Sequence, residues 1–385
     1  MPFVGLLRAN NLSPYLVNHT PSWIADSKSL RAAADVLMDK SEISFDTEFD
    51  SFNRTYGFTL HLIQVYDGET VYLIDPLAVK DLSPLWEVME NERIEKVGYA
   101  LGEDVRLMKV HGCHPRNLCD IQIARRLSNR TEAGLARSLE EDLGIILDKA
   151  SQTSDWSKRP LTAAQLEYLA NDVIHLFRLR DDNSGYRESE ELTAIYREEM
   201  KMLEEVEIAE RVVELSRAQM KRFSPECQER LLDILRWRDG IARELNVPTN
   251  YVVQSEQLES ILENRHAFLE NPFARGFHPR VRSNNRYRNA LIDILMLVPD
   301  DCSPVKFVSA LTREERMALR EQRLDQEEKI MRDVFLPLEA ELLSHHGVEV
   351  VKFLLRGIRK IIVQPEPDLD SLRPYQRRLV ERYMR

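Results

Sequence analysis

The sequence predicts an α/β domain, in which helices flank a mixed sheet, followed by an all-helical second half. Two observations support this prediction. Before residue 187, short segments that alternate apolar and polar residues are interleaved with helix-like segments, as in a sheet covered by helices. From residue 189 the chain is rich in charged, helix-forming residues and the strand pattern is lost. Because 385 residues are too many for one compact core, we expect several domains.

The strands and helices of the first half follow from local patterns. Residues 43–49 alternate apolar and polar side chains, which is typical of a half-buried strand. Residues 60–66 and 70–74 predict two more strands, joined at Asp67-Gly68 by a tight hairpin turn. A further short strand is expected at 96–99. The predicted helices of this half cover residues 84–90, 102–111, 120–126 and 162–179.

The last of these helices has a clear start signal. Thr162 is a favourable N-cap, and Gln165 stands three residues later, which is the spacing of a capping box. Changes in composition then divide the chain into parts. We expect a first domain over residues 1–190, a helical linker over 191–216, a helical domain over 217–300 and a helical C-terminal region over 301–385.

Composition limits the function classes. The chain has 64 acidic and 53 basic residues, a net charge of −11, which argues against a nucleic-acid partner unless the charges are unevenly distributed. No apolar run is long enough for a membrane span, and the N-terminus lacks the pattern of a signal peptide. The four cysteines show no disulfide-framework spacing, so we expect a cytoplasmic protein.

Five residues with acidic or phenolic side chains form the candidate site. Asp46 and Glu48 lie two apart on a predicted strand, so both point to one face, where they repel each other unless a cation lies between them. Asp104 falls in the first turn of a predicted helix. Tyr168 and Asp172 are four apart and therefore share one face of a helix. Each feature alone is also typical of ordinary protein surface.

The order of these features changes that interpretation. An Asp-x-Glu strand, then an Asp on a helix, then Tyr-x-x-x-Asp on a later helix is the pattern of the DEDD exonucleases, tyrosine subclass. The chain resembles the ribonuclease D family in particular. The segments that carry this resemblance are 45–49, 62–64, 73–77, 96–97, 148–151, 154–161 and 168–172. The resemblance implies a ribonuclease-H-like exonuclease fold for the first domain.

The resemblance also implies a reaction and a role for each residue. The protein would remove 3′-terminal nucleotides from RNA as 5′-monophosphates, using two divalent ions, Mg²⁺ or Mn²⁺. Asp46 would bridge both ions, Glu48 and Asp172 would complete the first site, and Asp104 would serve the second. Tyr168 would orient the attacking water, since a phenol of ordinary pKa is a poor base at neutral pH.

The resemblance implies RNA as the partner, with the single-stranded 3′ ends of structured RNAs such as tRNA precursors as natural substrates. Thr47, Phe49 and Arg159, beside these motifs, are expected to contact nucleic acid. Two alternatives stay open from the sequence. One is a DNA 3′→5′ exonuclease, and the other is a non-catalytic scaffold that binds nucleic acid.

The second half carries a local reversal of charge. Residues 271–292 contain five arginines and no acidic residue, which favours a phosphate-binding surface, although a solvated helix face is the alternative. The arginines are Arg275, Arg280, Arg282, Arg286 and Arg288. Residues 231–238 and 242–248 resemble the HRDC domain, an accessory helical module of nucleases and helicases. Residues 310–363 are weakly similar to a second copy.

Three further positions need an interpretation. Tyr99 stands where the ribonuclease D family often has a histidine, and we expect altered local packing there. Asp120 is interpreted as the N-cap of the helix that follows it. Residues 111–119 hold two histidines and two cysteines, but their spacing matches no common zinc site.

Overall fold

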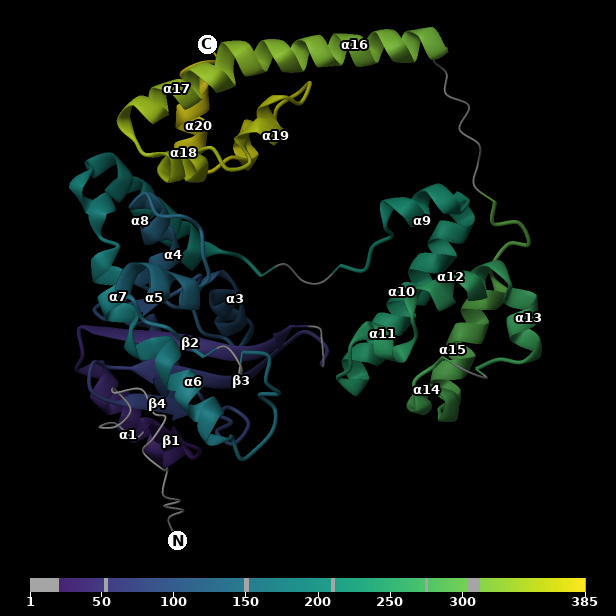
Figure 1. The fold of residues 1–385 in the computed structure, drawn as a ribbon. Coiled ribbons are helices and arrows are strands. Elements are labelled where there is room, and N and C mark those ends of the chain that lie inside the picture. The colour runs from purple at the N-terminus through teal and green to yellow at the C-terminus, as the bar shows by residue number, and fades with distance from the viewer. Residues whose placement is uncertain are drawn as a thin grey trace. The chain divides into compact units, whose positions relative to one another are not determined.

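The structure is a computed structural model that describes residues 21–51, 55–148, 152–208, 212–273, 276–303 and 312–384 (Figure 1). It divides into two compact units. The first unit comprises Met1–Glu48, Leu60–Ile208 and Leu311–Arg385. The second comprises Phe49–Thr59 and Ala209–Ala310.

A six-stranded mixed sheet is the centre of the first unit. Its strands follow the order β1-β4-β3-β2-β5-β6. The β1/β4, β2/β5 and β5/β6 pairs are parallel, whereas β3 and β4 are antiparallel. The strands are β1 (Ser22–Ile24), β2 (Glu42–Ser51), β3 (Phe58–Tyr66), β4 (Val71–Ile74), β5 (Glu95–Gly98) and β6 (Leu118–Asp120).

The predicted strands and hairpin are confirmed. Ile43 and Phe45 of β2 are fully buried, as expected for the core face of an alternating strand. At the turn between β3 and β4, the Asp67 carboxylate accepts the backbone N–H groups of Glu69 and Thr70, at 2.9 and 2.7 Å. Gly68 has a φ of +95°, a conformation that a residue with a Cβ rarely adopts.

Helices cover the sheet, so the predicted fold class is confirmed. Between residues 21 and 208 they are α1 (Ser27–Met38), α2 (Ser83–Glu90), α3 (Gly102–Val110), α4 (Ile121–Leu127), α5 (Leu135–Leu143), α6 (Ala163–Ile174), α7 (Leu176–Asp182), the 3₁₀ helix η1 (Gly185–Glu188) and α8 (Glu190–Glu205). Helix α6 packs on β4, α7 on β5 and α8 on β6.

The caps of two helices agree with the sequence. Thr162 and Gln165 form a capping box at the start of α6. Asp120 caps α4 by accepting the backbone N–H groups of Gln122 and Ile123. The helix predicted over residues 162–179 is interrupted at His175, which separates α6 from α7. The apolar stripe continues across this break, so periodicity could not indicate it.

Further helices of the first unit come from the C-terminal region. They are α16 (Arg313–Ile330), the π-helix η2 (Met331–Phe335), α17 (Leu336–His345), α18 (Val348–Leu354), α19 (Ile358–Ile362), the 3₁₀ helix η3 (Leu369–Ser371) and α20 (Pro374–Glu381). Helix α18 packs against α4, and α20 packs against α8. The Arg126 guanidinium lies 5.8 Å from the centre of the Phe353 ring across this contact.

The second unit has a helical core of its own. Its helices are α9 (Arg217–Arg222), α10 (Pro225–Leu245), α11 (Thr249–Val252), α12 (Ser255–Glu263), α13 (Arg265–Glu270), α14 (Pro279–Ser283) and α15 (Asn285–Met296). Apolar residues of α10, α12 and α15 are fully buried in one cluster, among them Leu231, Leu258 and Leu291. The all-helical second half is therefore confirmed as a class.

The structure pairs two of the four cysteines, which their spacing in the sequence did not indicate. Cys227 and Cys302 form a disulfide in the second unit, with their Cα atoms 5.5 Å apart. The two cysteines are 75 residues apart in the sequence, and only the fold of the unit brings them together. Cys113 and Cys119 are free and buried.

Of the helices that the structure describes, none combines the length and the apolar character that spanning a membrane requires.

Candidate active site

Strand β2 and helix α6 bring three carboxylates together. Oxygen atoms of Asp46, Glu48 and Asp172 all lie within 4.8 Å of one another. Among the described residues, this is the one group of three or more His, Cys, Asp or Glu side chains arranged to hold a metal ion. Three of the four predicted carboxylate ligands therefore meet at one point.

A buried hydrogen bond fixes α6 against β2 at this point. The Ser44 hydroxyl donates to the backbone carbonyl of Val173 over 2.8 Å. Ser44 lies on the same face of β2 as Asp46, and Val173 follows Asp172 directly. The bond thus sets the distance between the two elements that carry the carboxylates. Because Ser44 is two residues before Asp46 on this strand, the alternation of side chains could have indicated that Ser44 lies beside the site.

The fourth carboxylate reaches the site from α3. Asp104 is buried in the first turn of this helix, and it accepts a short hydrogen bond from the Thr47 hydroxyl. Asp104 lies outside the group of three, yet its charge raises the pKa values of Asp46 and Glu48. Thr47 itself is buried and serves as a partner of this carboxylate. Its predicted contact with nucleic acid stays a prediction.

Burial and mutual repulsion disfavour the charged forms of these acids. Burial, followed by repulsion from the neighbouring carboxylates, raises the pKa of Asp46 well above its ordinary value and that of Glu48 to about 9. Burial likewise raises the pKa of Asp104 to about 6 and that of Asp172 to about 7. Such a cluster is unfavourable without a cation at its centre.

The donor set fits a hard divalent cation. One carboxylate oxygen of Asp172, Oδ2, is buried and has no hydrogen-bond partner among the described residues. A buried oxygen left without a donor is costly, and coordination to a cation would satisfy it. Carboxylate oxygens are the ligands that Mg²⁺ and Mn²⁺ prefer. The acidic cluster can therefore hold metal.

Tyr168 completes the constellation on α6. It stands one helical turn before Asp172, and its ring stacks on Trp156 with centroids 5.8 Å apart. Burial and the adjacent Asp172 raise the pKa of the Tyr168 phenol, so it keeps its proton at neutral pH. A protonated Tyr168 can donate a hydrogen bond and orient a bound group.

Arg159 anchors the loop that carries Trp156. Its guanidinium makes a bidentate ion pair with Asp75, at 2.7 and 2.8 Å, and also donates to the backbone carbonyls of His61, Trp156 and Lys158. These bonds join the loop to the sheet. The observed contacts of Arg159 stabilise the loop that packs against Tyr168. Its predicted contact with nucleic acid stays a prediction.

A cavity of about 340 Å³ opens beside the carboxylates. Asp46, Tyr168 and Asp172 line it, together with Tyr99 and residues 134–137 at the start of α5. The Tyr99 hydroxyl donates to the carbonyl of Ala133 over 2.5 Å and lies 2.7 Å from the Ser138 hydroxyl. Tyr99 thus holds α5 against the cavity, a role that the sequence alone did not indicate.

The remaining predicted contacts lie in the second unit. The Phe49 ring is half-buried and lies 6.0 Å from the Phe58 ring. Arg280 and Arg282 are exposed and make no ion pair with any described residue, whereas Arg286 pairs with Glu244. The Arg288 guanidinium lies 5.3 Å from the Phe273 ring centre. Arg275 lies outside the described residues.

The two cysteines of the segment 111–119 are buried and free. Among the described residues, this segment is not one of the groups arranged to hold a metal ion. The Cys119 sulfur instead accepts a hydrogen bond from the Tyr196 hydroxyl.

Comparisons with known proteins agree with this geometry. The profile of the 3′-5′ exonuclease family matches residues 21–182. Ribonuclease D of Shewanella sp. (strain ANA-3) is 40% identical over 159 residues, which span 41% of this chain and 41% of that relative. Ribonuclease D of Escherichia coli (strain K12) is 31% identical over 291 residues, which span 73% of this chain and 76% of that relative.

The fold agrees with a solved structure of the same group. The crystal structure of Escherichia coli RNase D superposes with a TM-score of 0.63 at 24% identity, covering 94% of this chain and 99% of that one. The Shewanella match covers less than half of either chain. The Escherichia coli match extends over three quarters of the relative. The chain therefore belongs to the ribonuclease D family.

Proposed function

We propose that this chain is a metal-dependent 3′→5′ exoribonuclease that removes 3′-terminal nucleotides from RNA as 5′-monophosphates. The observation that carries the proposal is the group of three carboxylates within 4.8 Å, flanked by Asp104 and Tyr168. Binding of nucleic acid alone does not require such a costly cluster of acids.

Asp46, Glu48 and Asp172 would hold one divalent ion, and Asp46 with Asp104 a second, both Mg²⁺ or Mn²⁺. Bound ions of this kind stabilise negative charge on the attacking and leaving oxygens of a phosphoryl transfer. In the reaction, a water oxygen attacks the last internucleotide phosphorus and the bond to the 3′ oxygen breaks. The shortened strand keeps a 3′-hydroxyl, and the released nucleotide carries the 5′-phosphate.

The residues of the chain have separate tasks in this reaction. Tyr168 keeps its proton and, one helical turn before Asp172 on α6, occupies a position from which it can orient the attacking water. The Trp156 ring restricts the Tyr168 ring to one orientation. Ser44 holds Asp172 at its distance from Asp46.

The substrate follows from the family. The Escherichia coli relative is described as an exoribonuclease involved in structured RNA processing. We extend this role to the present chain, with the single-stranded 3′ ends of structured RNAs such as tRNA precursors as its substrates. The basic surface of the second unit would hold more distant parts of the RNA, in the manner of an HRDC domain.

The test is the degradation of a 5′-labelled single-stranded RNA in Mn²⁺ by the wild type and by Asp46→Asn. Loss of one charge from the group of acids should lower the rate by at least about 100-fold, because cation binding depends on it. A ladder that shortens from the 3′ end in the wild type and disappears in the variant is the expected result. Glu103→Gln, an exposed neighbour of Asp104 on α3, is the matched control and should leave the ladder intact.

Two outcomes would contradict the proposal. Faster degradation of a DNA strand of the same sequence would make the protein a DNA exonuclease. Tight binding of RNA without release of any nucleotide, in Mg²⁺ or Mn²⁺, would make it a scaffold.

A further inference from the structure

The cavity beside the carboxylates contains one basic side chain. Of the described residues that line it, Arg137 alone is a lysine or arginine. An RNA strand that enters this cavity brings phosphates toward Asp46 and Asp172. Ions bound by these acids offset their charge at the scissile phosphate, but the next phosphate needs a cation of its own.

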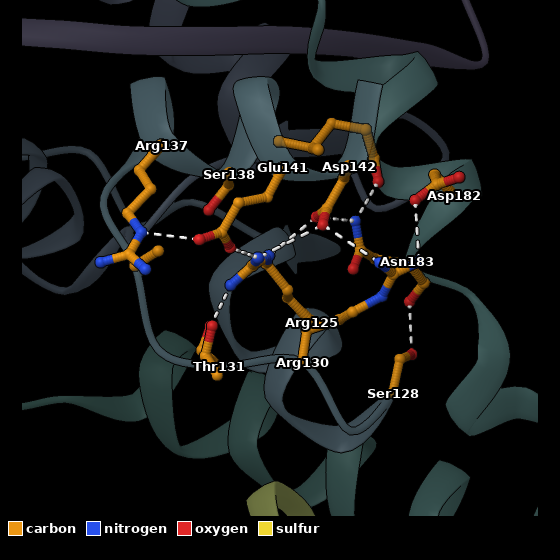
Figure 2. Close-up of polar contacts among 12 residues, drawn as sticks. Arg125, Ser128, Arg130, Thr131, Arg137, Ser138, Glu141, Asp142, Asp182 and Asn183 are labelled. Atoms are coloured by element: carbon orange, nitrogen blue, oxygen red, sulfur yellow. Dashed lines mark hydrogen bonds and ion pairs between the residues drawn. The ribbon is translucent and has the colours of Figure 1, made fainter. Parts of the chain in front are cut away.

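Helix α5, which carries Arg137, is anchored by a buried ion pair (Figure 2). The Arg125 side chain, only 2% exposed, pairs with Asp142 at 2.7 Å and with Glu141 at 2.5 Å. The side-chain amide of Asn183 donates to the same Asp142 over 3.0 Å. These bonds connect α4, α5 and the end of α7. The helix is therefore a fixed wall of the cavity.

Glu141 connects this buried network to Arg137 (Figure 2). One oxygen of Glu141 accepts from Arg125, and the other accepts from Nε of Arg137 over 2.6 Å. The two terminal nitrogens of Arg137 have no hydrogen-bond partner among the described residues, and the side chain is 66% exposed. The guanidinium is thus oriented through Nε while its two outer nitrogens stay available to a ligand.

We propose that Arg137 is a phosphate-binding residue that holds the internucleotide phosphate on the 5′ side of the scissile one. The outer edge of a guanidinium matches two oxygens of a phosphate, and Nε is already occupied by Glu141. Arg137 pairs with Glu141 and makes no ion pair with Asp46, Glu48, Asp104 or Asp172, and we assign to it the next phosphate along the strand. The site rests on the proposed function, because its ligand is the RNA that the carboxylates would cleave.

Substrate length separates this role from others. The dinucleotide ApA contains only the scissile phosphate, whereas ApApA contains one more on its 5′ side. Arg137 should therefore contribute to the binding of ApApA and not to the binding of ApA. A side chain that only stabilised α5 would affect both substrates equally.

The experiment compares initial rates on ApA and ApApA in Mn²⁺ for the wild type, Arg137→Ala and Arg137→Lys. Because the contact is exposed to solvent, alanine should raise KM for ApApA by about 3- to 10-fold and leave kcat unchanged. KM for ApA should not change, and lysine should restore part of the affinity. On longer single-stranded RNA, the log–log dependence of KM on salt should become shallower by about 0.7 for the one lost contact.

Arg130→Ala is the matched control. Arg130 belongs to the same network, 44% exposed and paired with Asp142 and Asp182, but it does not line the cavity. Its loss should not change KM for either substrate. An equal rise of KM for both variants, or for both substrates, would overturn the assignment of Arg137. So would an unchanged KM for ApApA in Arg137→Ala. A wild type that cleaves neither substrate would overturn the proposed function, and this site with it.

Discussion

At Asp46, the need to bind a cation opposes the stability of the fold. Four carboxyl groups share a partly buried site, and each ionised form raises the free energy of the others. The folded protein keeps protons on these groups at pH values where the unfolded chain has lost them. In the metal-free protein, no cation offsets the repulsion among these carboxylates, so their ionisation lowers the free energy of unfolding.

This conflict predicts how the stability of the metal-free protein depends on pH. The pKa values of Asp104, Asp172 and Glu48 are raised to about 6, 7 and 9 in the folded state. Between about pH 4.5 and 9 the folded state binds more protons than the unfolded state, so the free energy of unfolding falls as pH rises, by about 1.4 kcal/mol per pH unit for each proton. Below that window, these groups carry no penalty.

Thermal melts in EDTA from pH 5.5 to 8.5 measure this dependence. We expect Tm to fall with rising pH in the wild type, and to fall less steeply in Asp46→Asn, which has lost one of the competing charges. Added Mn²⁺ should raise Tm more at pH 8.5 than at pH 5.5, because binding requires ionised carboxylates. Parallel curves for the two proteins would show that the cluster does not control this stability.

At the scale of the element, the loop over residues 154–160 is the part that determines the position of Tyr168. Trp156 is 5% exposed and stacks on the Tyr168 ring, and Arg159 holds this loop to Asp75 after β4. The Asp75 side chain is 6% exposed, so the ion pair is shielded on that side. An arginine that binds at one end to the sheet and at the other to the loop carbonyls cannot be replaced by a point charge.

We therefore expect Arg159→Lys to lower the free energy of unfolding by about 2 kcal/mol, since lysine cannot make the bidentate pair. The looser loop should lower kcat by several-fold and change KM little. Urea unfolding and steady-state kinetics on a short RNA measure the two effects. If Arg159 is instead a phosphate ligand, as the sequence suggested, lysine will leave stability unchanged and raise KM.

The same scale shows what could be predicted from the sequence. The capping box at Thr162, the cap at Asp120 and the Asp67-Gly68 turn depend on neighbours within three residues, and all three are confirmed. The resemblance to a family predicted that the carboxylates of β2 and α6 share one site, and the structure brings them together. Strands β1 and β6 have three residues each, too few for periodicity to indicate.

Long-range contacts account for what could not be predicted. Helix α5 reaches the cavity because Arg125 pairs with Asp142 across 17 residues and Tyr99 bonds to Ala133 across 34. In the sequence, Arg137 and Glu141 are one more i, i+4 pair of the kind found on many solvated helices. Nothing local connects that pair to the site.

At the scale of the whole molecule, the net charge of −11 hides an uneven distribution. Residues 271–292 contain five arginines and no acidic residue, so all of the acidic side chains lie elsewhere in the chain. Long-range attraction of RNA depends on such local fields more than on net charge. Residues 271–292 therefore differ locally from the composition of the whole chain, and their contact with RNA stays a prediction.

The arginines of this surface are not equivalent. Arg280 and Arg282 are exposed and make no ion pair with any described residue, whereas Arg286 is already paired with Glu244. An arginine that must leave a carboxylate to reach a phosphate gains less from the exchange. Arg280→Ala/Arg282→Ala should therefore weaken the binding of a long single-stranded RNA by about 10-fold, and Arg286→Ala should weaken it less.

Fluorescence anisotropy over a salt series in EDTA, where no cleavage occurs, measures these affinities. The double variant should reduce the slope of log affinity against log salt by about 1.4, the value for two contacts with a single strand. Cleavage of ApA in Mn²⁺ should match that of the wild type, because so short a substrate extends no farther than the carboxylates. If the double variant and Arg286→Ala both bind RNA like the wild type, these arginines are ordinary solvated surface. A loss of ApA cleavage would mean instead that the substitutions disturb the first unit.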